Sequence, residues 1–168
     1  MQVFLGPGAT GGVASLERYI DGLAQRGVEA RPVELPGGNA ERAVPVFLQR
    51  SGSGSDVVIG GRSYGGRVAS LAAAAPGSEF AGLLLFAYPL HRPGFPEQLR
   101  TEHWPRIQCP VLIVQGDSDP FGSPAELRRE AGKLRKVQIE VLAGTGHALK
   151  ERLDDALDVA SRWIAGLG

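Results

Sequence analysis

The most informative segment of the chain is Asp56-Val57-Val58-Ile59-Gly60-Gly61-Arg62-Ser63-Tyr64-Gly65-Gly66-Arg67-Val68-Ala69-Ser70. Its composition predicts a buried strand, then a sharp turn that carries one serine, then a helix of small residues. Gly61 and Gly65 flank Ser63 at the G-x-S-x-G spacing of a nucleophile elbow. A serine at such a turn has a strained backbone, and its neighbours must lack side chains so that strand and helix can pass closely. The segment therefore predicts a serine presented at the end of a buried strand.

The composition is that of a soluble globular protein with no strong charge. With 168 residues the chain is long enough for one well-buried domain and too short for two ordinary ones, so we expect a single domain over residues 1–168. Eighteen basic and eighteen acidic side chains cancel, so no general field favours nucleic acid or an anionic membrane. The one cysteine, Cys109, cannot form an internal disulfide and is expected to fill apolar space.

The first residues do not resemble a signal peptide, because Met1–Leu5 has no basic region and meets a glycine loop at once. No apolar run approaches the ~18 residues that are needed to span a bilayer. We therefore expect a cytoplasmic protein without membrane partners, present as a monomer or a homodimer.

Short apolar runs alternate with helical patterns along the chain. We expect strands at Val3–Leu5, Glu29–Glu34, Val57–Gly60, Leu83–Phe86, Val111–Gln115 and Val137–Leu142. We expect helices near Val13–Gln25, Ala40–Gln49, Tyr64–Ala75, Pro124–Leu134 and Leu149–Ala165. This alternation predicts an α/β fold with a mainly parallel sheet that has helices on both faces. Pro32 cannot donate to a strand ladder, so the second strand is expected at an edge.

A serine hydroxyl is a poor nucleophile near neutral pH and needs a general base beside it. His147 follows the last predicted strand, at the same end of the sheet as Ser63, so the two side chains can meet. The base in turn needs a carboxylate to orient it. The loop after the fifth strand offers Asp117 and Asp119, of which Asp119 lies further beyond the strand end, while Asp117 is expected to organise the turn. The order Ser63, Asp119, His147 is the one expected when these groups lie on successive strand ends.

Acyl transfer also requires backbone N–H groups that stabilise a developing oxyanion. We expect one from Tyr64, directly after the serine, and the other from Ala9 in the glycine loop after the first strand, with Thr10 as the alternative. The same loop has a rival interpretation, because Gly6-x-Gly8-x-x-Gly11 matches a dinucleotide-binding fingerprint and Glu34 follows near the usual ribose-binding position. An oxidoreductase of that type would leave Ser63, Asp119 and His147 without a role.

Taken together, these motifs resemble those of a small, nearly lidless member of the α/β-hydrolase superfamily, in particular the dienelactone-hydrolase-like group of serine hydrolases. The resemblance rests on Gly60–Ala69, Tyr88-Pro89-Leu90-His91, Pro93-Gly94, Leu99-Arg100-Thr101, Gly116-x-x-Asp119-Pro120-Phe121-Gly122 and Gly146-His147. It implies a single α/β-hydrolase domain with a six-stranded parallel sheet in the order 2-1-3-4-5-6. It also implies that the domain lacks the first antiparallel strands of larger members and a large lid. The chain departs from the group at Pro7, where histidine is usual, which leaves the choice of oxyanion donor open.

The longest irregular stretch, Ala87–Cys109, has a length and an aromatic content that suggest a binding region. We take Tyr88, His91 and Phe121 as candidates for the substrate pocket. Arg67 is expected to be a surface residue or an ion-pair partner.

Together these patterns predict a serine hydrolase that cleaves a small carboxylic ester or a thioester through an acyl-enzyme. Ser63 is the predicted nucleophile, His147 the base and Asp119 its orienting carboxylate. No metal or organic cofactor is required. A nicotinamide-dependent oxidoreductase and a catalytically idle interaction module of the hydrolase fold are the alternatives.

Overall fold

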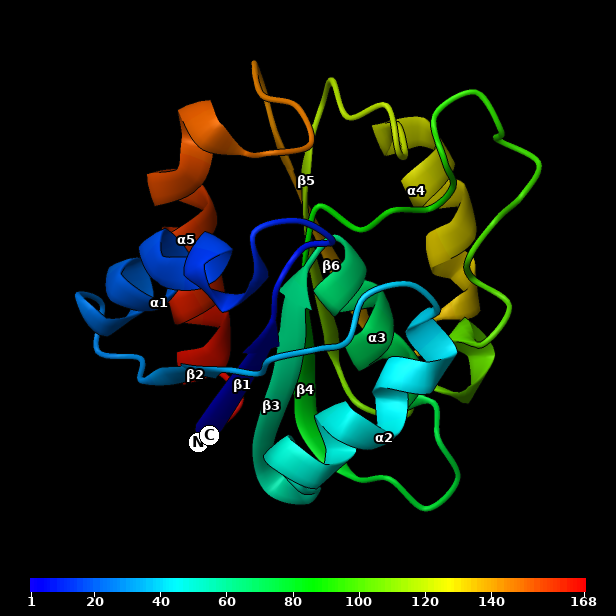
Figure 1. Ribbon diagram of the computed structural model, residues 1–168. Helices are drawn as coiled ribbons and strands as arrows, with labels where there is room; N and C mark the ends of the chain where they lie inside the picture. Colours follow the sequence, from blue (N-terminus) through cyan, green and yellow to red (C-terminus); the bar gives the residue numbers. More distant parts are fainter.

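In the computed structural model, which describes residues 1–168, six parallel strands form one sheet in the order β2-β1-β3-β4-β5-β6 (Figure 1). The strands are β1 (Gln2–Gly6), β2 (Ala30–Pro32), β3 (Gly54–Arg62), β4 (Phe80–Phe86), β5 (Val111–Gly116) and β6 (Val137–Leu142). The predicted α/β class and strand order are confirmed. Strand β2 lies at the edge and pairs only with β1, as the lack of an N–H group at Pro32 predicts.

Helices cover both faces of the sheet, with α1 and α5 on one side and α2, α3 and α4 on the other (Figure 1). The α-helices are α1 (Glu17–Ala24), α2 (Ala40–Ser51), α3 (Tyr64–Ala73), α4 (Pro124–Glu130) and α5 (Leu153–Ala165). Short 3-10 turns are η1 (Gly12–Leu16), η2 (Trp104–Arg106), η3 (Ala131–Lys133) and η4 (Lys150–Arg152). None of the helices combines the length and the apolar character that crossing a membrane needs.

Three predicted helices are shorter than expected, because each divides into an α-helix and a 3-10 turn. Gly11 and Gly12 have positive φ angles directly before and at the start of η1, and Leu149 has a positive φ directly before η4. A 3-10 turn follows each of these positions before the α-helix begins, so α1 and α5 start later than the apolar pattern predicts. At α4 the chain tightens into η3 at the helix end, as last turns often do.

The central strands are buried on both faces, and their side chains alternate between two hydrophobic clusters. Ile59, Leu85 and Ile113 pack under α2, α3 and α4, whereas Val58 and Leu84 pack under α1 and α5. This explains why apolar residues run continuously in β3, β4 and β5, instead of alternating with polar ones.

Glycines let the turn after β3 approach the loop after β1 more closely than any side chain permits. A Cβ atom at Gly61 would lie 2.5 Å from the carbonyl oxygen of Gly6, and a Cβ at Gly65 would lie 2.1 Å from the same atom. At Gly60 a Cβ would lie 2.1 Å from the carbonyl oxygen of Leu84 in the neighbouring strand. Strands β1, β3 and β4 and the start of α3 therefore meet backbone to backbone.

The long segment between β4 and β5 contains only the short turn η2, yet buried hydrogen bonds fix it to the core. The hydroxyl of Tyr88 donates to the carbonyl of Arg100 at 2.7 Å, and the N–H of Arg100 donates to the carbonyl of Leu90 at 2.8 Å. Ser70 on α3 lies 2.7 Å from Nε2 of His103. Burial, and after it the charges of Arg67 and Arg106, lower the pKa of His103 to about 4, so this imidazole is neutral near pH 7.

Replacing Gly65 with alanine is expected to destabilise the protein strongly, since the methyl group would collide with backbone atoms that cannot rotate away. Overpacking typically costs about 1–3 kcal/mol, and we expect a loss of at least about 3 kcal/mol in the free energy of unfolding. Urea unfolding followed by circular dichroism measures the change.

Gly132→Ala is the matched control, because a Cβ at Gly132 meets no atom within 4 Å. This variant is expected to stay within about 1 kcal/mol of the wild type. An equal loss of stability at both positions would contradict the close crossing described for Gly65.

Candidate active site

Ser63 lies between β3 and α3 in a strained backbone conformation, with φ 48° and ψ −114°. Few L-residues adopt a positive φ, and such strain persists only where the surroundings enforce it. The N–H of Ser63 donates to the carbonyl of Phe86 at 2.9 Å, and its own carbonyl accepts from the N–H of Arg67 at 2.9 Å. The turn is therefore held on both sides and carries the serine out of the end of β3.

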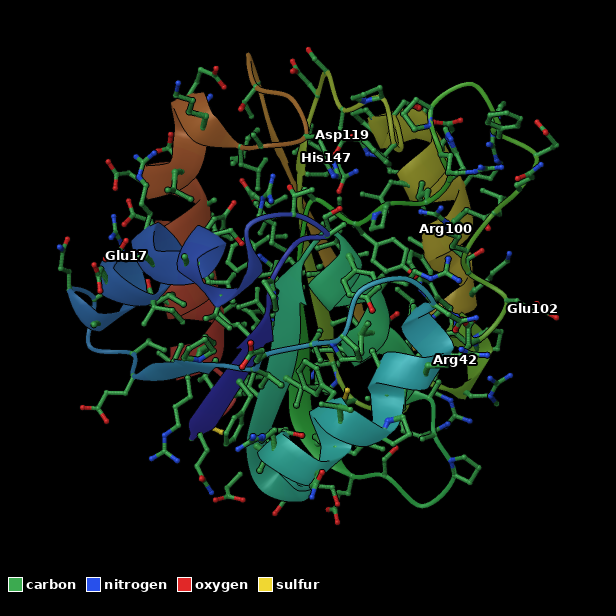
Figure 2. All side chains as sticks on the ribbon, in the orientation of Figure 1. Glu17, Arg42, Arg100, Glu102, Asp119 and His147 are labelled. Atoms are coloured by element: carbon green, nitrogen blue, oxygen red, sulfur yellow. The ribbon has the colours of Figure 1, made fainter.

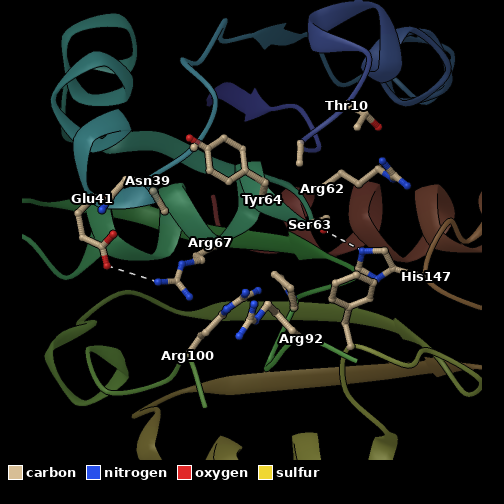
Figure 3. A pocket seen from close by; sticks show the side chains of 15 residues that line it. Thr10, Asn39, Glu41, Arg62, Ser63, Tyr64, Arg67, Arg92, Arg100 and His147 are labelled. Atoms are coloured by element: carbon tan, nitrogen blue, oxygen red, sulfur yellow. Dashed lines mark hydrogen bonds and ion pairs between the residues drawn. The ribbon is translucent and has the colours of Figure 1, made fainter. Parts of the chain in front are cut away.

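His147 comes from the loop after β6 and reaches Ser63 across the sheet. The serine Oγ lies 2.8 Å from Nε2 of His147, although the two residues are 84 positions apart (Figure 3). The histidine side chain is 19% exposed, so it is in part accessible from solvent. This is the distance at which an imidazole can accept the proton of a serine hydroxyl.

Asp119 follows β5, and its carboxylate lies on the far side of the imidazole from Ser63. Oδ2 is 2.8 Å from Nδ1 of His147, and the carboxylate is fully buried. The N–H of Phe121 donates to Oδ1 at 2.8 Å, so both carboxylate oxygens have partners. Figure 2 shows Asp119 and His147 together at the end of the sheet where the strands finish. The structure thus brings the three predicted residues into one hydrogen-bonded chain.

The neighbouring carboxylate, Asp117, is turned away from the histidine. It accepts hydrogen bonds from the N–H of Gly144 at 3.1 Å and from the hydroxyl of Ser118 at 3.0 Å. The Gly144 N–H, and after it the Ser118 hydroxyl, lower the pKa of Asp117. Asp117 therefore ties the loop after β5 to the loop after β6, which agrees with its predicted part in the turn.

Gln115, the buried penultimate residue of β5, is a supporting residue that the sequence analysis missed. Its Nε2 donates to Oδ2 of Asp119 at 3.2 Å and to the carbonyls of Tyr88 and Gly122 at 3.2 and 3.1 Å. Its Oε1 accepts from the N–H of Tyr88 at 2.9 Å. A glutamine at the end of the otherwise apolar run Val111–Val114 was the signal in the sequence that could have identified it.

Of the three predicted pocket residues, only Phe121 reaches the site. Its ring stacks on His147, with centroids 4.1 Å apart and an interplanar angle of 23°. Tyr88 is fully buried among core residues. His91 is also buried, between the carbonyl of Arg92 and the carboxylate of Glu126. The placement of Tyr88 and His91 differs from the expectation, because both residues hold the long segment to the core and do not face the cavity.

A cavity of about 620 Å³ opens beside Ser63 and His147. It is lined by Ala9, Thr10, Gly38, Asn39, Ala40, Glu41, Arg62, Ser63, Tyr64, Arg67, Pro89, Arg92, Arg100, Phe121 and His147 (Figure 3). Ala9 and Thr10 both border it, so either remains a candidate for the second oxyanion donor. The N–H of Tyr64 lies in the first turn of α3 and has no intrahelical acceptor.

The arginines of this cavity were not predicted as site residues. Arg67 does form the expected ion pair, with Glu41 at 3.4 Å, but it also lines the cavity. Arg92 and Arg100 come from the long segment that the sequence suggested as a binding region. Arg62 directly precedes the serine.

A second serine–histidine contact, between Ser70 and His103, has a different character. Ser70 is fully buried and donates its hydroxyl to the carbonyl of Arg67 at 2.7 Å. No carboxylate forms a hydrogen bond with the imidazole of His103. This pair therefore lacks both the access and the orienting acid that acyl transfer requires.

The glycine loop after β1 packs against the elbow. A Cβ at Gly6 would lie 2.9 Å from Cα of Gly65, and a Cβ at Gly8 would lie 2.7 Å from the guanidinium of Arg62. The glycines at these two positions thus serve close packing beside Ser63. No group of three or more His, Cys, Asp or Glu side chains is placed to hold a metal ion.

Comparisons with known proteins bear on the family and the fold of the chain. A family model described as an alpha/beta hydrolase domain matches residues 21–165. Rat and human ABHD14B, each named a putative protein-lysine deacylase, are 27% and 26% identical to the chain, over 86% of its length and 70% of theirs.

Solved structures share the fold at low sequence identity. A structure described with the metagenome-derived lipolytic enzymes LipS and LipT superposes with a TM-score of 0.81 at 15% identity, covering 98% of this chain and 93% of that one. The monoacylglycerol lipase of Paleococcus ferrophilus gives 0.80 at 16% identity, covering 99% and 95%. The extent of the family match, with the sheet order and the serine turn, shows that the chain belongs to the α/β-hydrolase superfamily.

Proposed function

We propose that the protein is a serine hydrolase that cleaves a small carboxylic ester or thioester through an acyl-enzyme. The observation that carries this proposal is the continuous hydrogen-bonded chain from Ser63 through His147 to the buried carboxylate of Asp119. Nucleophile, base and orienting acid lie at hydrogen-bonding distance in the order that acyl transfer needs.

In the proposed mechanism the Ser63 hydroxyl attacks the acyl carbon while Nε2 of His147 takes its proton. Asp119 holds the imidazole by its Nδ1–H and stabilises the imidazolium that forms. The imidazolium then protonates the leaving alcohol or thiol, which departs and leaves the acyl group on Ser63. Water, deprotonated by His147, attacks the acyl carbon. The bond to Ser63 Oγ then breaks, the imidazolium returns its proton to this oxygen, and the acid is released. The N–H groups of Tyr64 and of Ala9 or Thr10 are the proposed donors to the oxyanion.

The shape of the site favours a small substrate. The segment between β4 and β5 is the long connection beside the site, and the hydrogen bonds of Tyr88 fix it to the core. A cavity of about 620 Å³ falls within the range of small-molecule sites. We therefore propose short acyl groups as substrates, in keeping with the resemblance to the dienelactone-hydrolase-like group.

The name of the ABHD14B relatives points to acyl groups carried on lysine side chains. A lysine deacylase would form the same acyl-enzyme from an amide, with an amine in place of the alcohol as the leaving group. This is a second candidate within the same chemistry. The packing of the first glycine loop against the elbow argues against the dinucleotide-binding alternative. The continuous serine–histidine–aspartate chain argues against an idle module.

Labelling with a fluorophosphonate probe is expected to occur at Ser63 and to disappear in Ser63→Ala, because only a serine beside a general base reacts readily with such probes. In-gel fluorescence of the purified protein measures the labelling. Ser70→Ala is the matched control, since Ser70 also contacts a histidine but is fully buried. This control is expected to label like the wild type per folded molecule. Labelling that survives in Ser63→Ala, or that is absent from the wild type, would refute the proposal.

Replacing Asp119 with asparagine is expected to lower kcat/KM for a short 4-nitrophenyl ester by about 10³- to 10⁴-fold. The reason is that the imidazole of His147 loses the negative charge that orients it and keeps it in the correct tautomer. Asp117→Asn is expected to stay within about threefold of the wild type, since Asp117 contacts Gly144 and Ser118 and not the histidine. Steady-state release of 4-nitrophenol measures both variants. Similar losses in the two variants would mean that Asp119 acts only through the loop structure.

A further inference from the structure

The cavity beside Ser63 is strongly cationic, although the chain as a whole carries no net charge. Four arginines line it, namely Arg62, Arg67, Arg92 and Arg100, and only one carboxylate, Glu41, faces them. Figure 3 shows the guanidinium groups of Arg67, Arg92 and Arg100 converging on one side of Ser63, with Arg62 on the other side. The positive charge is thus gathered where a substrate must lie.

Carboxylates of the protein compensate little of this charge, and the partners of the Arg92 guanidinium, Oε1 of Gln98 at 3.1 Å and the ring of Phe95, are uncharged. Arg62, Arg92 and Arg100 form no ion pair, and the only pair, between Arg67 and Glu41, is long at 3.4 Å with a carboxylate that is 59% exposed. The guanidinium of Arg100 donates no hydrogen bond to any protein atom. Burial lowers the pKa of Arg100, and the charges of Arg67 and Arg92 near its guanidinium lower it as well.

The structure holds Arg100 in place by its backbone. Its carbonyl accepts the Tyr88 hydroxyl at 2.7 Å, and its N–H donates to the Leu90 carbonyl at 2.8 Å. Arg67 is fixed on the first turns of α3, just after the serine. Holding several like charges beside a single carboxylate is unfavourable, and an incoming anion relieves that repulsion. Guanidinium groups are also the side chains best suited to bind carboxylate and phosphate oxygens.

We propose that the substrate carries an anionic group, a carboxylate or a phosphate, that binds between Arg67, Arg92 and Arg100 while the scissile carbonyl lies at Ser63. This inference rests on the proposed function and narrows its substrate class to charged esters or thioesters. A nucleic acid or an anionic surface is a poor fit, because the cations line a cavity of about 620 Å³ in an otherwise neutral chain.

A pair of substrates that differ in one charge tests the proposal. The 4-nitrophenyl monoester of glutaric acid carries a free carboxylate, and its methyl ester carries none. The wild type is expected to show a kcat/KM about 10- to 100-fold higher for the charged ester, and Arg100→Gln is expected to lower this preference by about 10-fold. Arg128→Gln is the matched control, because Arg128 is exposed on α4 and does not line the cavity. This control is expected to keep the wild-type preference.

A second measurement distinguishes the two anions and separates this proposal from the proposed function. Calorimetric titration of the wild type and of Arg100→Gln with glutarate and with inorganic phosphate measures binding without chemistry. If Arg100→Gln binds either anion about 10-fold more weakly than the wild type does, the result supports the anion site even if neither ester is cleaved. The anion that the wild type binds more tightly identifies the charged group of the substrate.

The proposal is overturned if the wild type shows no preference for the charged ester and binds neither anion more tightly than Arg100→Gln does. If the neutral ester is nevertheless cleaved in a Ser63-dependent way, the proposed function survives that outcome. Absence of any ester cleavage in the wild type would instead count against the proposed function alone.

Discussion

The site depends on one close crossing of backbone, where the end of β1 meets the turn between β3 and α3. Gly6, Gly61 and Gly65 face one another there at distances that leave no room for a Cβ atom. The turn between β3 and α3 is consequently so tight that Ser63 takes a positive φ. The surrounding backbone, rather than the serine itself, holds this strain. The same crossing brings the loop that carries Ala9 and Thr10 to the cavity that Ser63 also lines.

The parallel sheet supplies the rest of the arrangement. The carboxyl ends of β3, β5 and β6 lie at one edge, so Ser63, Asp119 and His147 meet although long stretches of sequence separate them. Gln115 and the N–H of Phe121 fix the carboxylate of Asp119 before any substrate arrives. Groups that are already positioned need little rearrangement during a reaction, which is the advantage that buried hydrogen bonds offer here.

Features with strong local signals could be predicted from the sequence. Apolar runs and their spacing predicted the parallel sheet, the family resemblance gave its strand order, and Pro32 predicted the edge strand. The positions of Ser63, Asp119 and His147 followed from one topological rule about strand ends. Helix limits were predicted less well, since positive φ angles at residues such as Leu149 leave no mark in the hydrophobic pattern.

Features that depend on tertiary contacts could not be predicted in the same way. Tyr88 was expected in the pocket because aromatic residues are common there, but its hydroxyl instead binds the carbonyl of Arg100 inside the core. Arg67 and Arg100 converge only after α3 and the long segment have folded against each other. Because these arginines lie far apart in the sequence and no spacing rule connects them, the cationic cavity could not be predicted.

The most direct test of Ser63 as the acyl-carrying group is mass spectrometry of the protein quenched in acid during turnover of a short 4-nitrophenyl ester. The predicted result is the mass of one acyl group on the peptide that contains Ser63, and no adduct on that peptide in Ser63→Ala. Turnover without any acyl group on Ser63, or with the acyl group on another residue such as Ser70 or Cys109, would contradict the role assigned to Ser63.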